Sequence, residues 1–540
     1  MIWSLEIAKR SLQAQMLALD VTSHNIANVN TPGYSRQEAV FRPTQPYGIV
    51  SWLGSINPGQ VGTGVQISNI RRLRNDFVDM NYRNVTSESS YYSAKDQIYG
   101  ILESSINEIK DSGLQKALTS FFDAWHEGSV SPEDPTVRRI IVGQSQNLID
   151  AFKYVQNQLV STRSDVDFQL VNSVARINDI GKEVAKLNEQ ISLSVSEGQQ
   201  PNDLLDQRDS LLDELSQYVN IQKVVLPTGS VSVFIGGLSF VDDRKVNEIK
   251  AIDNDRITNT GGNYEYTEGL STYNVLPGLI VDGKWNGNVT LGSKDVYNGR
   301  VATLWITMGN SIVPLDERHL TSGKLKGLVE MRDDVIAYGD EPGRGLLAKI
   351  NEMAYYFFSK VNLMLKEGKD IEGNPYSSDF FAWNSLVPSY NIIPAVTLDP
   401  AVVSDPTKLP LGITGLPGDG SLALLIAQEQ NNALETVPEV LNSTQWNPTL
   451  PGFLKGQSVS QSWRTLIAEW SSDISRNRAF MEGTNNVKNE LLLLRTSESG
   501  VNLDEEAVNL IRFQKGYAMA ARIVSVVDGM LDLIINMGAR

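Results

Sequence analysis

The sequence predicts an α+β multidomain protein, with an elongated α-helical trunk of antiparallel and coiled-coil helices built from both chain ends and mainly β domains inserted in the middle. Two observations predict this fold. Apolar residues recur at every seventh position at both ends of the 540-residue chain, which places them on one face of a helix. From about residue 221 the apolar period changes to two, which is typical of strands.

The two terminal stripes are the first candidate functional residues. The N-terminal stripe is Leu5, Leu12, Leu19 and Ile26, and the C-terminal stripe is Leu503, Leu510, Tyr517, Val524 and Leu531, followed by Ile534. Burying such a side chain contributes roughly 1.5–3 kcal/mol, whereas an isolated helix of this length is marginal in water. An amphipathic helix in a globular core would explain either stripe alone. Matched stripes at both ends favour a shared assembly interface.

The order of elements follows from periodicity and helix-breaking residues. Helices are expected over about 75–110, 114–126 and 136–196, then from Pro201, and the returning helix over 344–366. Pro227 to Ser230 indicates a hairpin turn between strands. The expected domains are 1–70 (N-terminal helix and extended segment), 71–220 (first half of the trunk), 221–322 (β-rich outer domain), 323–367 (returning trunk helix), 368–451 (smaller outer insertion), 452–500 (last part of the trunk) and 501–540 (C-terminal axial helix).

A recognisable motif follows the first stripe. Thr31-Pro32-Gly33 must end a helix, because proline lacks the amide donor and glycine accepts positive φ. The run from Ser23 to Gln37 resembles the N-terminal signature of the bacterial flagellar axial proteins. His24 departs from it, since asparagine is usual there. The residues that carry the resemblance are Asn25, Ile26, Asn28, Thr31, Pro32, Gly33 and Tyr34.

The C-terminal run from Ser499 to Glu506 resembles the hook-associated members of the same family more than its rod and hook members. Asn502, Asp504 and Glu505 carry this likeness. Physically the run is a helix start, with Asn502 as the cap and carboxylates in the first turn. Two interior stretches, from Val231 to Gly237 and from Gly323 to Asp334, are similar to the family in matching order.

The resemblance implies a structural role at the junction of hook and filament. It implies a ring of copies of the chain, with the hook protein below, a second hook-associated protein and flagellin above, and an export chaperone on the C-terminal helix. It also implies an extracellular location on the flagellum after type III export without a cleaved signal peptide. A hook or distal-rod subunit remains one alternative, and a peptidoglycan hydrolase associated with flagellar assembly remains another.

Charge and apolar content exclude other partner classes. The net charge of −16 argues against nucleic acid and against an anionic membrane surface, since both require basic protein surfaces. No segment reaches the roughly 18 apolar residues of a membrane span. Arg71, Arg72 and Arg74 form the one tight basic cluster, and we expect a solvated face there.

Nothing in the sequence indicates chemistry, so we expect no enzyme activity, no cofactor and no metal. The three histidines are scattered and there is no cysteine. The run from Gly59 to Gly64 lacks the strand-to-helix context and the following lysine of a phosphate loop. Asp370 to Asn374 differs from a calcium loop in its early glycine and missing distal glutamate.

Overall fold

The computed structural model describes residues 2–45, 62–106, 113–253, 257–260, 263–268, 271–275, 280–281, 284–285, 302–337, 345–384, 387, 389–436 and 448–538. The chain forms two compact units. Unit 1 comprises Met1–Ser87, Ile177–Glu248 and Thr484–Arg540, and unit 2 comprises Glu88–Arg176 and Ile249–Gly483. Helices α2 (Asp76–Ile106), α4 (Pro135–Ser196) and α10 (Val459–Ser499) contribute residues to both units.

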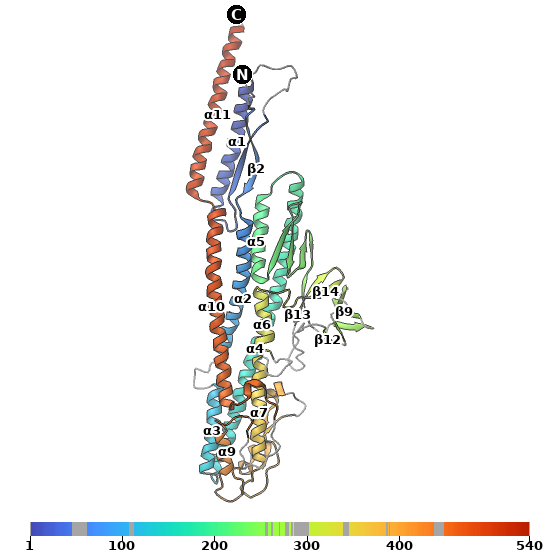
Figure 1. Ribbon diagram of the computed structural model, residues 1–540, viewed down its shortest axis with the longest axis vertical. Coiled ribbons are helices and arrows are strands. Elements are labelled where there is room, and N and C mark those ends of the chain that lie inside the picture. Colours follow the sequence, from blue (N-terminus) through green and yellow to red (C-terminus); the bar gives the residue numbers. More distant parts are fainter. Residues whose placement is uncertain are drawn as a thin grey trace. The chain divides into compact units, whose positions relative to one another are not determined.

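The two chain ends lie together in unit 1. Helix α1 (Ile2–Ala27) runs beside helix α11 (Leu503–Gly538), as Figure 1 shows. Strands β1 (Gln37–Pro43) and β2 (Val65–Arg72) form an antiparallel hairpin with a bulge after Val40, and this hairpin packs on α1. The shared core consists of Ala18, Val21 and Ala39, with Ile67, Ile70 and Phe513 packed against it.

The rest of unit 1 pairs helices with a small antiparallel sheet. Helix α5 (Asn202–Tyr218) precedes strands β3 (Ile221–Val225), β4 (Val231–Ile235), β5 (Leu238–Asp242) and β6 (Lys245–Val246), which pair in that order. Phe240 of β5 lies on α4, where a Cβ added at Gly181 would be 2.7 Å from its ring. Glycine at that position therefore permits the close approach of helix and sheet.

Unit 2 contains a second sheet. Its strands are β7 (Ile249–Asp253), β8 (Ile257–Thr260), β9 (Asn263–Glu268), β10 (Ser271–Val275), β13 (Ala302–Met308) and β14 (Ser311–Pro314), in the order β7-β13-β14-β10-β9-β8. Only β10 and β14 pair in parallel among the described strands of this sheet. A separate short pair joins β11 (Ile280–Val281) to β12 (Lys284–Trp285).

The helices of unit 2 enclose an aromatic core. They are α3 (Leu114–Val130), α6 (Lys324–Glu330), which continues into the π-helical turn η2 (Met331–Val335), α7 (Leu346–Lys366), and parts of α2, α4 and α10. Phe121 of α3 contacts Phe357 of α7 at a centroid distance of 5.6 Å. Phe381 stacks on Phe358 at 4.2 Å.

Phe380 and Phe381 belong to the segment 368–451, for which the sequence suggests an outer insertion. In the structure both rings are fully buried, so this segment completes the core of α3 and α7. Its elements are short: β15 (Phe381–Ala382), η3 (Ser389–Asn391), η4 (Ile393–Ala395), β16 (Thr397–Leu398), α8 (Pro400–Ser404), η5 (Pro406–Lys408) and α9 (Ser421–Gln428), followed by η6 (Gly452–Leu454).

The predicted α+β class, with helical ends and sheets in the middle, is confirmed. The long helix expected over 136–196 is α4, and the turn at Pro227 to Ser230 joins β3 to β4 as expected. The run from Gly59 to Gly64 lies mostly outside the described residues. Among the described residues, no helix combines the length and apolarity that crossing a membrane requires.

Candidate assembly interface

Helices α1 and α11 pack through small residues. Asn25 lies opposite Glu506, and Gln15 lies opposite Gly516, so the helices are antiparallel. A Cβ added at Gly516 would be 2.9 Å from the side-chain amide carbon of Gln15. The most deeply buried apolar residues of the two helices are Ala8, Ala14, Ala18, Val21, Ala520 and Val527.

The predicted stripes flank this line of small residues. Leu12, Leu19, Ile26, Leu510, Val524 and Leu531 are half-buried, whereas Leu5, Leu503, Tyr517 and Ile534 are exposed. Two helices and a hairpin cannot enclose a full heptad seam, because each leucine needs neighbours on several sides to leave water. The role of these ten residues in assembly therefore stays a prediction.

Asn25 joins three elements at the base of the helix pair. Its side-chain amide donates to the Gln37 carbonyl at 2.9 Å and to Glu506 Oε2 at 3.2 Å. Its Oδ1 accepts from the Gln37 amide at 2.9 Å and from the Tyr34 hydroxyl at 2.8 Å. All the hydrogen-bonding capacity of this buried amide is used, so the end of α1, the start of β1 and the first turn of α11 are fixed together.

The environment of Tyr34 keeps its hydroxyl protonated. Burial raises the pKa of Tyr34 above its ordinary value, and the charges of Asp203, Asp206 and Glu506 raise it further. The phenol therefore remains a donor to Asn25 at neutral and moderately alkaline pH.

Arg36 connects the hairpin to the C-terminal helix. Its Nε lies 2.7 Å from Glu506 Oε1 and its Nη1 lies 2.6 Å from Glu505 Oε2. The backbone amide of Arg36 donates to the Ser499 carbonyl at 2.9 Å. Asn502 caps α11 by accepting from the Asp504 amide at 2.9 Å, as its position in the sequence predicts. Chain segments from both ends thus share one polar joint.

A buried cluster of ion pairs lies next to this joint. Arg74 pairs with Asp79 at 2.5 Å and Arg72 pairs with Asp206 at 2.6 Å. Asp209 is also enclosed by these arginines. The further members are Arg83, Asp213, Lys223 and Arg495.

The charges in the cluster stabilise one another. Burial alone would raise the pKa of Asp209, but Arg74, Arg83, Lys223 and Arg72 hold it below its ordinary value. The carboxylate is therefore ionised in the folded protein throughout the neutral range.

The cluster corrects one prediction. The predicted solvent exposure is correct for Arg71, whose side chain is 57% exposed and pairs with Glu38. The prediction is wrong for Arg72 and Arg74, which are buried in the cluster. The Arg74 side chain is only 9% exposed. The sequence does contain a sign of these buried ion pairs, because Asp206, Asp209 and Asp213 fall on one face of α5 and could have been recognised as partners for the arginines.

The motif residues form a tight turn after α1. Thr31 donates to Asn28 Oδ1 at 3.1 Å, and Gly33 has a φ of +80°, which glycine adopts without strain. Pro32 is exposed.

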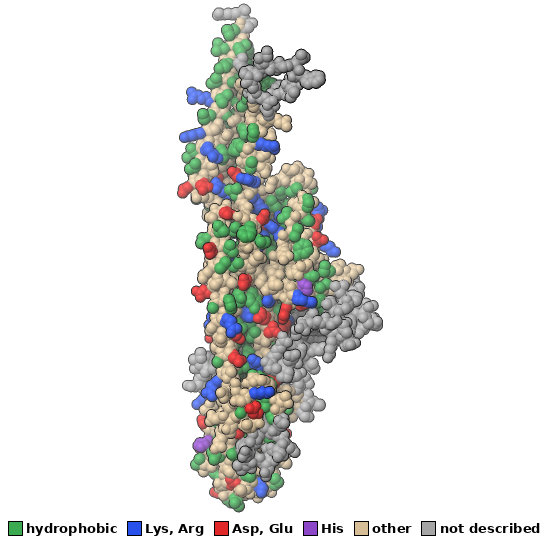
Figure 2. All heavy atoms as spheres, in the orientation of Figure 1, with side chains coloured by type: hydrophobic (Ala, Val, Ile, Leu, Met, Phe, Trp, Pro, Cys, Tyr) green, Lys and Arg blue, Asp and Glu red, His purple; other side chains and the backbone are tan. Residues whose placement is uncertain are grey.

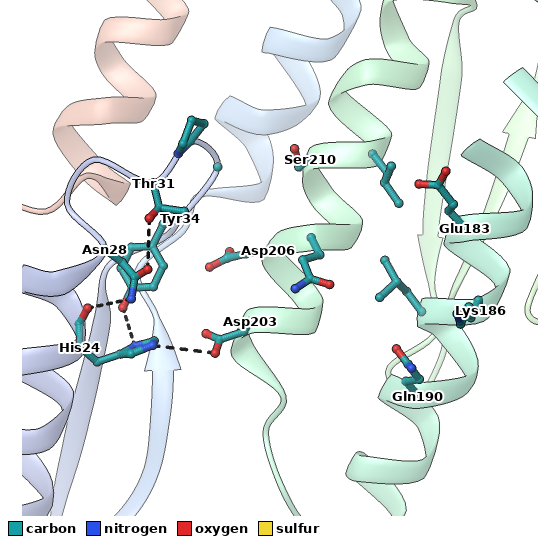
Figure 3. A pocket seen from close by; sticks show the side chains of 15 residues that line it. His24, Asn28, Thr31, Tyr34, Glu183, Lys186, Gln190, Asp203, Asp206 and Ser210 are labelled. Atoms are coloured by element: carbon teal, nitrogen blue, oxygen red, sulfur yellow. Dashed lines mark hydrogen bonds and ion pairs between the residues drawn. The ribbon is translucent and has the colours of Figure 1, made fainter. Parts of the chain in front are cut away.

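A cleft of about 670 Å³ separates this turn from α4 and α5. Figure 3 shows His24 and Tyr34 on one side, Asp203 and Asp206 of α5 facing them, and Lys186 of α4 beyond. His24 Nδ1 lies 3.0 Å from the Tyr34 hydroxyl oxygen, and His24 Nε2 lies 3.9 Å from Asp203. The chain just after the turn is held to α5 through Ser35, whose backbone amide and hydroxyl donate to Asp206 at 3.0 Å and 2.6 Å. In the part of the chain that the structure describes, no group of three or more histidine and carboxylate side chains could hold a metal ion.

Comparison with known protein families adds independent evidence at both ends of the chain. Residues 5–34 match the family described as flagella basal body rod protein, and residues 495–537 match the C-terminal family of flagellar basal body rod FlgEFG proteins. Residues 99–298 match the helical domain of flagellar hook-associated protein FlgK. At both ends and in its helical middle, the chain is therefore similar to flagellar axial proteins.

Two curated relatives align over nearly the whole chain. The hook-associated protein 1 of Bacillus subtilis is 28% identical, with 98% of this chain and 97% of the relative covered, and that of Escherichia coli is 26% identical, with 98% of each covered. The chain is thus similar to flagellar hook-associated protein 1 along nearly its whole length. A solved structure of the flagellar hook junction protein FlgK from Burkholderia pseudomallei is 23% identical with a TM-score of 0.42, covering 56% of this chain and 47% of that one.

Proposed function

We propose that this chain is a structural subunit of the bacterial flagellum that joins the hook to the filament. The observation that carries the proposal is the joint at Asn25, Arg36 and Glu506, which ties residues from opposite ends of the sequence into one helix pair. The similarity to known proteins supports the same role, because the alignments with two hook-associated proteins extend over nearly the full length of both.

The mechanism is interfacial rather than catalytic. In this proposal the half-buried leucines of α1 and α11 complete their burial against neighbouring axial subunits. Copies of the chain form a ring, with the hook protein on one side and the second hook-associated protein and flagellin on the other. Before assembly, an export chaperone covers the apolar face of α11 and the chain leaves through the type III apparatus to its extracellular site.

A double substitution tests the proposal. Changing Leu510 and Leu531 to Asp places carboxylates on the half-buried face of α11, and burying these charges without a partner has a high free-energy cost. We expect unit 2 to stay folded, as judged by near-ultraviolet circular dichroism of its aromatic core, while incorporation into flagella and motility are lost. Ala518→Asp, at an exposed position of the same helix, is the matched control and should assemble normally. Normal motility of the double variant would contradict the proposed role of this face.

The enzyme alternative has its own test. We expect the purified chain to release no soluble fragments from peptidoglycan, since the relatives are structural proteins. Measurable turnover, retained in the Leu510→Asp and Leu531→Asp double variant, would favour a wall hydrolase over a junction subunit.

A further inference from the structure

Lys360 of α7 lies in the apolar core of unit 2. Its side chain is only 1% exposed, and its neighbours on the helix, Phe357 and Val361, are buried as well. In Figure 2, by contrast, lysine, arginine and carboxylate side chains are spread over the visible face of the molecule, where water solvates them. Burial lowers the pKa of Lys360 below its ordinary value, although the charge of Glu429 offsets part of this effect. The buried ammonium group therefore loses a proton more readily than a surface lysine does.

One buried carboxylate contacts both Lys360 and an asparagine side chain. Glu429, the residue directly after α9, is 4% exposed. Its Oε2 forms an ion pair with Lys360 Nζ, and its Oε1 accepts a hydrogen bond from Asn432 Nδ2 at 3.0 Å. Lys360 Nζ also donates to the carbonyl oxygen of Ala433, the residue after Asn432, at 2.8 Å. The lysine nitrogen and the asparagine amide thus meet at the two oxygens of one carboxylate.

These three side chains contain the parts of an acyl transfer. A desolvated lysine amine is a nucleophile, and a carboxylate within about 2.6–3.2 Å of a reacting group can carry its proton. Glu429 Oε2 faces the nitrogen that has to lose a proton, and Oε1 faces the amide nitrogen that has to gain one. Asn432 is exposed, so ammonia released from it has a path to water while Lys360 stays shielded.

We propose that Lys360 and Asn432 form an intramolecular isopeptide bond. Glu429 takes one proton from the Lys360 ammonium group, and the neutral Nζ attacks the side-chain amide carbon of Asn432. Glu429 passes this proton to Nδ2, and the bond from the amide carbon to Nδ2 breaks as the tetrahedral intermediate collapses. The released ammonia takes up the second amine proton and leaves as ammonium. A secondary amide remains, Glu429 is again a carboxylate, and the step needs no oxidant and no cofactor.

The bond ties α7 to the turn after α9 in a chain that has no cysteine. A covalent loop restricts the unfolded chain, as a disulfide does. The reacting groups come from segments that are far apart in the sequence and meet only in folded unit 2, so an unfolded chain stays linear. The inference is independent of the proposed function, since it concerns the covalent structure of a single chain.

The mass of the purified, folded chain tests the bond directly. We expect the intact mass to fall short of the sequence mass by one ammonia molecule. Trypsin does not cleave after an acylated lysine, so the digest should contain residues 350–366 joined to residues 409–455 in one branched peptide. Asn432→Ala should restore the full mass and release residues 350–360 as a separate peptide. Asn431→Ala, at the exposed neighbouring position, is the matched control and should retain the branched peptide.

The proton carrier has its own variant. Glu429→Gln keeps the size of the side chain but cannot accept a proton from Lys360, so we expect the full mass and no branched peptide. Near-ultraviolet circular dichroism checks that unit 2 of this variant is folded. If the variant fails to fold, the comparison of Asn432→Ala with Asn431→Ala still decides whether the bond exists.

Three outcomes would overturn the inference. The first is an intact wild-type mass equal to that of the sequence, with residues 350–360 released in full. The second is a loss of ammonia confined to a linear peptide, because an asparagine that cyclises on its own backbone gives the same mass. The third is a branched peptide that persists in Asn432→Ala, because the lysine would then be joined to a different acceptor. None of these results bears on the role of the chain in the flagellum.

Discussion

The Asn25 side-chain amide donates to Glu506 Oε2 at 3.2 Å, although the two residues are 481 positions apart in the sequence. This hydrogen bond joins helix α1 to helix α11. Both side chains are almost fully buried, so the bond is protected from competition by water. The joint that it anchors is the basis of the first prediction.

Replacing Glu506 with Gln removes the charge that Arg36 faces while keeping the size of the side chain. We expect a loss of about 1.5–3 kcal/mol in the stability of the α1–α11 docking, the range for hydrogen bonds to charged groups. Amide hydrogen exchange measures this loss, because the amides of α1 should exchange faster in the variant. Glu505→Gln is the matched control, because Glu505 contacts the same arginine but is 58% exposed, and its loss should stay below about 1 kcal/mol. Equal effects of the two substitutions would contradict this account.

Asp209 makes the stability of unit 1 sensitive to acid. Its pKa lies below the ordinary value of about 3.9, so its stabilising contribution is complete above that pH and is lost as the pH falls through and below it. Asp209→Asn should cost about 3–5 kcal/mol at pH 7, because it leaves buried arginines without their partner, and should weaken the acid dependence. Urea unfolding at pH 7 measures the cost of the substitution, and the difference between pH 7 and about pH 2.5, below the unfolded-state pKa, measures the acid dependence.

Asp76→Asn serves as the control for the cluster. Asp76 pairs with Lys223 at 3.0 Å but is 84% exposed, so we expect a change below about 1 kcal/mol and an unchanged acid dependence. An Asp209→Asn chain as stable as the Asp76→Asn chain would mean that the cluster contributes little to folding.

The segment 368–451 should be necessary for the core of unit 2. Phe381→Ala removes a ring stacked on Phe358 and should destabilise unit 2 by about 3–5 kcal/mol. Leu416→Ala, in the same segment but 69% exposed, should be close to neutral. Thermal unfolding followed by near-ultraviolet circular dichroism distinguishes them. A near-neutral Phe381→Ala would show that this segment is independent of α3 and α7.

Hydrogen exchange along α11 should change abruptly near residue 531. In the antiparallel register set by Asn25–Glu506 and Gln15–Gly516, the N-terminal end of α1 lies opposite about residue 529. Amides from Glu506 to Val527 should therefore exchange slowly in the monomer, and those after Leu531 should exchange fast. Uniformly fast exchange in both helices would mean that the ends pair only after assembly or on a chaperone.

The sequence by itself determined the helices and their faces. An apolar residue at every seventh position specifies which side of a helix is buried. Thr31-Pro32-Gly33 predicts a helix end before it, because proline lacks the amide donor and glycine accepts positive φ. The same local rules located α4, the β3–β4 turn and the Asn502 cap. These features depend on neighbours within one or two helical turns, which a sequence pattern contains.

Only the tertiary structure decided which polar residues are buried and which apolar faces stay open. Arg72 and Arg74 look like surface cations until Asp206 and Asp209 lie against them. These partners are more than a hundred positions away in the sequence, whereas Asp79, which also pairs with Arg74, is only five positions away. The exposed apolar residues of α11, such as Met519 and Met530, likewise become evident only when α1 and the hairpin cover the other face of the helix. Burial is a property of three-dimensional neighbours, so periodicity predicts that a face is apolar but not which partner covers it.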